Sequence, residues 1–229
     1  MYTTFKLLPK DIKYFHSLVK KTKEFGGVLK ISNNKVIENK TSEKGNIYSV
    51  GYDKKNNTYG IEYHSHAYYP KLELYSTEEI LKKIKRRMKT NMMDALFIFE
   101  CDIMKVHPPS PQDCYICSLN LKSGMLVCAQ EGIYEITYNM KYPCSIHIKE
   151  KIDKIYYTCF WGMDREYVTS KLESNNNDDV FEVLQKCSMH HLNYKDDDLI
   201  KVYLNFLKKY HFECTLIKWR DVPNHLFFS

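Results

Sequence analysis

The chain has 229 residues, of which 44% are hydrophobic, 14% aromatic and 27% charged, with 8 glycines and 7 prolines. This composition is typical of a folded domain with a sizeable core and excludes disordered, collagenous and disulfide-scaffold chains. The 34 Lys and Arg residues exceed the 28 Asp and Glu residues by six. So small a basic surplus disfavours a dedicated nucleic-acid-binding protein.

The sequence predicts a protein without membrane partners. No run approaches the roughly 20 apolar residues that a membrane-spanning helix requires, and residues 1–10 lack the apolar stretch of a signal peptide. The eight cysteines are scattered between Cys101 and Cys214, which indicates reduced thiols rather than a compact disulfide framework. We therefore expect a cytoplasmic location.

The first third of the chain combines one helix with short strands. Pro9 suits a first helical position, and the apolar residues after it recur at three-to-four spacing. Asn33 and Asn34 form a turn signal between two runs with strand character. The expected elements are a helix at residues 9–19, strands at 25–32, 35–38, 47–52 and 59–66, and a helix at 76–88.

The middle of the chain predicts a buried strand, a capped helix and a hairpin. The unbroken apolar run 95–99 suggests a strand covered on both faces and central in its sheet. Ser110 is a favoured N-cap residue, and Pro111 follows it at the first helical position. Residues 125–129 and 132–138 predict the hairpin. Together these elements predict an α/β (α+β) fold with a curved mixed sheet flanked by helices.

The pattern changes after about residue 145. Apolar stripes at helical spacing occur in residues 180–184 and 199–207, and one more strand is expected at residues 216–219. We expect residues 1–145 to form one domain and residues 146–229 an α+β extension packed on it.

Three motifs within residues 8–140 resemble the JAMM/MPN (JAB) domain family, which includes zinc isopeptidases acting on ubiquitin-like conjugates. The segment Glu24-Phe-Gly-Gly-Val-Leu29 is similar to the family's Glu-x-x-Gly-x-Leu strand. Ser110-Pro-Gln-Asp113 is similar to its Ser-x-x-Asp helix start, and residues 126–137 look like the hairpin that follows. The resemblance implies an MPN-like sheet. Some MPN-containing proteins of large DNA viruses look similar in having such a C-terminal extension, and the Lys-, Asn- and Tyr-rich composition suits an AT-rich genome of that kind.

The resemblance also implies roles for individual residues. In the family, two histidines of a His-x-His motif and the Asp bind metal, the Glu transfers protons and the Ser assists the oxyanion. Glu24 and Ser110 are therefore the catalytic candidates, and Asp113 is a metal-ligand candidate. The family's seven-residue gap before Ser110 places Glu100 and Asp102 at the two histidine positions. Three carboxylates suit Mg, Mn or Ca better than zinc.

A His-x-His motif is present elsewhere, at His64-Ser-His66. Alternate residues of a strand point to the same side, so these two imidazoles could bind one ion. Pairing them with Asp113 requires a helix and a strand inserted into the metal loop. Two metal sets therefore stay open, a degenerate Glu100, Asp102 and Asp113 set and an alternative His64, His66 and Asp113 zinc set.

The two sets predict different functions. The degenerate set, which keeps the family's spacing and element order, favours a non-catalytic MPN-like scaffold or partner-binding subunit without a cofactor. Its expected partner is a protein, namely another MPN-type chain, a second copy of itself or a ubiquitin-like protein. The alternative is a metal-dependent isopeptidase with zinc as cofactor and Glu24 as general base.

Overall fold

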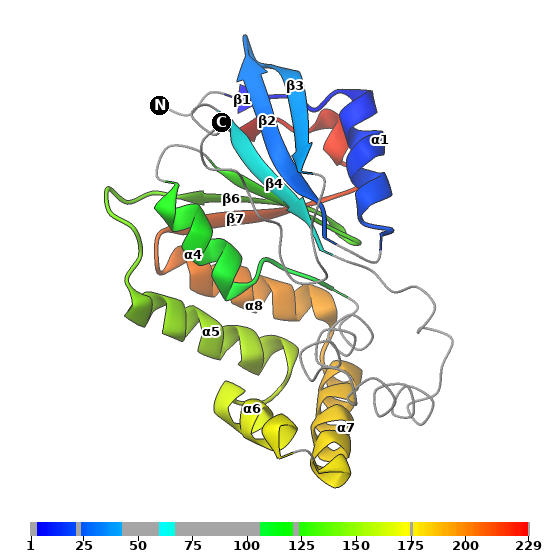
Figure 1. Cartoon of the computed structure of the whole chain (residues 1–229), viewed down its shortest axis with the longest axis vertical. Coiled ribbons are helices and arrows are strands. Elements are labelled where there is room, and N and C mark those ends of the chain that lie inside the picture. Colours follow the sequence, from blue (N-terminus) through cyan, green and yellow to red (C-terminus); the bar gives the residue numbers. More distant parts are fainter. Residues whose placement is uncertain are drawn as a thin grey trace.

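A mixed sheet of six strands forms the centre of the fold in the computed structural model (Figure 1), which describes residues 4–21, 24–42, 60–66, 106–120, 124–174 and 176–228. The strands lie in the order β3, β2, β4, β5, β6, β7. Neighbours are antiparallel except for β4 and β5, which run parallel. The strands are β2 (Gly26–Ser32), β3 (Lys35–Ser42), β4 (Ile61–Ser65), β5 (Met125–Ala129), β6 (Gly132–Tyr138) and β7 (Phe212–Lys218).

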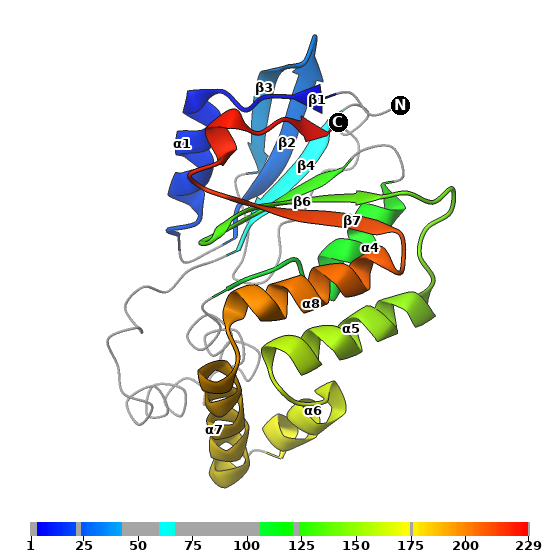
Figure 2. The ribbon, with the colours of Figure 1, turned by 180° about the vertical axis from the view of Figure 1, so that it is seen from behind.

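Helices cover both faces of this sheet (Figures 1 and 2). One face carries α1, the short turn η2 and the small β1–β8 strand pair, and the other carries α4, α5 and α8. The helices α6 and α7 extend from the second layer away from the sheet. The elements outside the six-stranded sheet are β1 (Thr4–Phe5), α1 (Pro9–Leu18), α4 (Pro111–Leu119), α5 (Ile146–Phe160), α6 (Arg165–Glu173), α7 (Asn177–Asn193), α8 (Asp196–Lys208), η2 (Val222–Asn224) and β8 (Phe227–Phe228).

Each face of the sheet has its own hydrophobic core. The strand β5 shows the division, because its side chains alternate between the two sides. Met125 and Val127 are buried with α4, α5 and α8, whereas Leu126 and Cys128 are buried with α1 and the β1–β8 pair. The sheet is therefore covered on both sides at β5, and the polar side chains on β4 described below lie on the α4 side.

The structure confirms the expected α+β class, with a mixed sheet flanked by helices. It also confirms the helix after Pro9, the β2–β3 and β5–β6 hairpins and the helix that starts after Ser110. The elements expected at residues 47–52, 76–88 and 95–99 lie outside the described residues. The division at residue 145 stays a prediction, although β7 from the C-terminal part pairs with β6 in the same sheet.

Among the described helices, none is both long enough and apolar enough to cross a membrane.

Candidate metal centre

The candidate metal centre lies where β4 ends and α4 begins. Because β5 runs parallel to β4, the chain must return across the sheet between them, and α4 forms part of that return. The first turn of α4 therefore lies near the carboxyl end of β4. Polar binding sites occur at this end of parallel strands, where the connecting segments begin.

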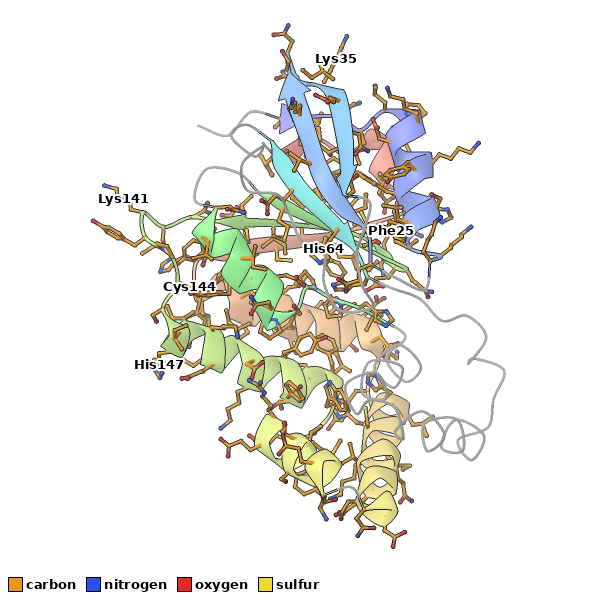
Figure 3. The ribbon with its side chains drawn as sticks, viewed as in Figure 1. Phe25, Lys35, His64, Lys141, Cys144 and His147 are labelled. Carbon is orange, nitrogen blue, oxygen red and sulfur yellow. The ribbon has the colours of Figure 1, made fainter. Side chains whose placement is uncertain are left out.

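Alternation along β4 brings two histidines to this place. Ile61 and Tyr63 are buried in the core beside α1, so Glu62, His64 and the following His66 face the opposite side, toward α4. Figure 3 shows His64 at the end of β4, close to Phe25 of the neighbouring chain segment. The backbone N–H of His66 donates to the carbonyl oxygen of Cys128 at 2.9 Å, which continues the β4–β5 pairing by one residue.

Asp113, in the first turn of α4, meets both imidazoles. The Nε2 atom of His64 lies 3.3 Å from Asp113 Oδ1, and the Nε2 atom of His66 lies 3.5 Å from Asp113 Oδ2. One possible ligand atom from each of the three residues lies within 4.8 Å of the others. Zinc bonds of about 2.0–2.1 Å in tetrahedral geometry place neighbouring ligand atoms about 3.3–3.4 Å apart. The His64 distance has that spacing, and the His66 distance, measured to the other oxygen of Asp113, is slightly longer.

Hydrogen bonds outside the three residues fix how His66 and Asp113 are oriented. The Nδ1 atom of His66 lies 2.9 Å from the carbonyl oxygen of His107. A carbonyl only accepts, so Nδ1 carries the proton and the lone pair of a neutral ring is on Nε2, facing Asp113. Asp113 Oδ2 accepts the backbone N–H of Ser110 at 2.7 Å, and Ser110 Oγ accepts the N–H of Asp113 at 3.2 Å, which forms a capping box.

The electrostatics of the three residues favour a cation between them. Burial disfavours the charged carboxylate, but the adjacent His64 and His66 outweigh it and hold the pKa of Asp113 well below its usual range. Burial likewise opposes the charged form of His66, yet its hydrogen bond to Asp113 and the charge of that carboxylate raise the pKa of His66. Without a positive charge, the Nε2 lone pair of His66 and the Asp113 carboxylate would repel each other. A proton or a metal ion removes that repulsion.

Glu24 lies beside these residues, two positions before β2 begins. Gly26 pairs with His64 in the β2–β4 ladder, and the N–H of Ser65 donates to the carbonyl of Phe25 at 2.7 Å. Continuing the register places Glu24 opposite His66 on the same face of the sheet. The Glu24 carboxylate contributes to raising the pKa of His66, and Glu24 is 9% exposed. Gly26 carries no side chain between Glu24 and the ring of His64.

The structure therefore brings together five of the residues singled out in the sequence, namely Glu24, His64, His66, Ser110 and Asp113. These residues include the alternative His64, His66 and Asp113 set, in which the histidines and Asp113 are far apart in the sequence. Glu100 and Asp102 lie outside the described residues, so their place at a degenerate site stays a prediction.

Sequence reasoning missed the residues that support His66. The carbonyl of His107 holds the imidazole, and Glu131 in the β5–β6 turn accepts the backbone N–H of His107 at 2.7 Å. Tyr134 also donates its hydroxyl to Glu131, at 2.7 Å. No local sequence signal connects a turn carboxylate to a loop 24 residues earlier. The βαβ topology is the signal that could have found them, because polar groups near the carboxyl end of a parallel strand such as β4 commonly belong to a binding site.

Comparisons of the chain with protein-family models, with curated proteins and with solved structures give no match. The resemblance to JAMM/MPN domains therefore depends on the sequence motifs and stays a prediction.

Proposed function

We propose that this chain is a zinc-dependent hydrolase that resembles JAMM enzymes and cleaves isopeptide bonds in ubiquitin-like conjugates. The observation that carries the proposal is the approach of His64, His66 and Asp113, whose possible ligand atoms lie within 4.8 Å of one another, with each imidazole 3.3 or 3.5 Å from a carboxylate oxygen. The conjugate substrate comes from the resemblance of the motifs, whereas the metal set comes from the geometry.

The donor set suits a catalytic rather than a structural zinc site. Structural sites use four protein ligands, whereas catalytic sites use three and keep one position open. Two imidazoles and one carboxylate supply three ligands, and the orientation of His66 by a backbone carbonyl is the usual support for a metal-binding histidine. A bound zinc ion would polarise the scissile carbonyl and lower the pKa of a water molecule to about 7.

The other residues have roles that follow from their chemistry. Glu24 accepts a proton from the attacking water as the water oxygen bonds to the carbonyl carbon. As the C–N bond breaks, Glu24 returns that proton to the leaving amine, so the proton count balances. Ser110 Oγ accepts the N–H of Asp113, which leaves the hydroxyl proton of this partly exposed residue able to donate to the oxyanion.

Glu24→Gln tests the proposal. The protein, purified without chelator, should contain about one zinc per chain and cleave isopeptide-linked di-ubiquitin, seen on a gel. Loss of a general base should lower the cleavage rate by about 10²–10⁴-fold, while zinc content measured by elemental analysis stays unchanged. Glu150→Gln is the matched control, because Glu150 is an exposed carboxylate on α5. Cleavage by Glu24→Gln at the wild-type rate would refute the assigned role.

The non-catalytic scaffold is the competing function. It predicts that the protein binds its partner without zinc and that His64→Ala leaves partner binding intact. A metal-free wild-type protein with no cleavage of any linkage would favour this alternative over the hydrolase.

A further inference from the structure

The loop between His107 and Ser110 carries both the support of His66 and the start of α4, yet it has few backbone donors. Pro108 and Pro109 have no N–H, so the loop can donate from the backbone only at His107 and Ser110. Ser110 donates to Asp113, inside the candidate metal centre. The bond from the His107 N–H to Glu131 therefore ties this loop to a different part of the sheet.

The position of the Glu131 carboxylate is itself determined by a buried partner. Glu131 Oε1 accepts both the His107 N–H and the Tyr134 hydroxyl, each at 2.7 Å. Tyr134 is fully buried and His107 is 8% exposed, so neither donor can readily exchange its carboxylate acceptor for water. Losing the Glu131 carboxylate would leave two buried donors unpaired, and the loop would have to move to satisfy them.

We propose that Glu131 is a positioning residue that acts on His66 through the backbone of His107. Glu131 holds the N–H of His107, and the carbonyl of the same residue accepts the Nδ1 proton of His66. The placement of the carbonyl decides which ring nitrogen carries the proton and where Nε2 points. This inference rests on the proposed function for its effect on zinc, but the orientation of the ring is a property of the metal-free protein as well.

Three variants separate positioning from charge and from general destabilisation. Glu131→Ala removes the acceptor, whereas Glu131→Gln keeps a carbonyl oxygen that can accept both hydrogen bonds, removes the negative charge and places an NH2 group where the second carboxylate oxygen was. Glu135→Ala is the matched control. Glu135 is a buried carboxylate on β6 that accepts the N–H of Phe228 and lies 3.3 Å from His225, on the α1 side of the sheet.

The first measurement is long-range proton–nitrogen NMR of the metal-free proteins. Wild type, Glu131→Gln and Glu135→Ala should show a slowly exchanging proton on Nδ1 of His66, and Glu131→Ala should lose it. The second is zinc affinity from competition with a chromogenic chelator. Glu131→Ala should bind zinc about 10–100-fold more weakly, as is typical when the support of a metal-binding histidine is lost. Glu131→Gln and Glu135→Ala should stay near the wild-type affinity.

Each other outcome has a defined meaning. A protected Nδ1 proton in folded Glu131→Ala would overturn the inference, as would its absence from wild type. Equal losses in Glu131→Gln or in Glu135→Ala would also overturn it, because charge or general destabilisation would then be the cause. A wild-type protein that shows the protected proton but binds no zinc would refute the proposed function alone, and the NMR comparison would still decide the role of Glu131.

Discussion

Removing one imidazole from the candidate metal centre should abolish the stabilisation of this protein by zinc. A ligand that binds only the folded state stabilises it by about 2.7 kcal/mol when present at about 100 times its Kd. One kcal/mol shifts the Tm of a chain of this length by about 2–4 °C, so zinc should raise the Tm of the wild-type protein by about 5–11 °C. His64→Ala removes one of three ligands and should show almost no increase.

The substitution also affects the metal-free protein. His64 and Asp113 are largely buried, with side-chain exposures of 8% and 13%, and the Nε2 atom of His64 lies 3.3 Å from Asp113 Oδ1. Removing one partner of a buried charged contact costs at most about 3–5 kcal/mol, and the loss of the His64 imidazole costs less because His66 remains beside the carboxylate. The metal-free variant should therefore melt below wild type. The informative quantity is therefore the increase in Tm that zinc produces in each variant, measured against the same variant without zinc.

Differential scanning calorimetry with zinc and with EDTA measures this increase. His147→Ala is the control, because His147 is an exposed histidine at the start of α5, with 72% of its side chain accessible. It should show the full wild-type increase. If His64→Ala gained as much from zinc as His147→Ala, zinc would be bound elsewhere and the assignment of His64 would be refuted.

Three further predictions concern stability, each measured by urea unfolding. In the metal-free protein His66 has a raised pKa and Asp113 a lowered one, relative to ordinary values of 6.5 and 3.8. The contribution of His66 to the free energy of unfolding is complete below pH 6.5 and is lost as the pH rises through the pKa of His66 in the folded protein. The contribution of Asp113 is complete above pH 3.8 and is lost as the pH falls through the pKa of Asp113 in the folded protein. The stabilisation from these two groups should therefore be greatest between pH 3.8 and pH 6.5. Zinc should reduce the loss of stability at alkaline pH. A free energy of unfolding that rises at alkaline pH without zinc would contradict the role given to His66. Ser110→Ala removes the capping acceptor and should cost about 1 kcal/mol, whereas Ser110→Thr should cost less; equal losses would argue against the cap. Tyr203→Phe removes the hydroxyl that donates to the Pro109 carbonyl at 2.9 Å and should cost about 1–2 kcal/mol, and no measurable loss would show that this buried bond contributes little.

Local sequence signals were sufficient for the parts of the site that local structure determines. Ser110 and Asp113 predicted a capped helix start, and the structure shows both hydrogen bonds of a capping box. Alternation along a strand predicted that His64 and His66 share one side, and both reach Asp113. Each of these predictions depends on residues no more than three positions apart.

The approach of the two histidines on β4 to Asp113 on α4 could not be predicted in the same way. A fixed seven-residue spacing led to Glu100 and Asp102, whereas residues 67–109 separate His66 from Ser110 in this chain. The approach depends on the parallel pairing of β4 with β5, which is a long-range contact without a short motif. Glu131 illustrates the same limit, since its partner His107 belongs to the connection between those strands.

The small β1–β8 pair brings two segments that are far apart in the sequence next to each other. Thr4 lies opposite Phe228, and β1 and β8 lie away from the His64 labelled in Figure 3. Fluorescent labels attached at positions 4 and 228 would therefore lie near each other, on the side of the protein remote from His64.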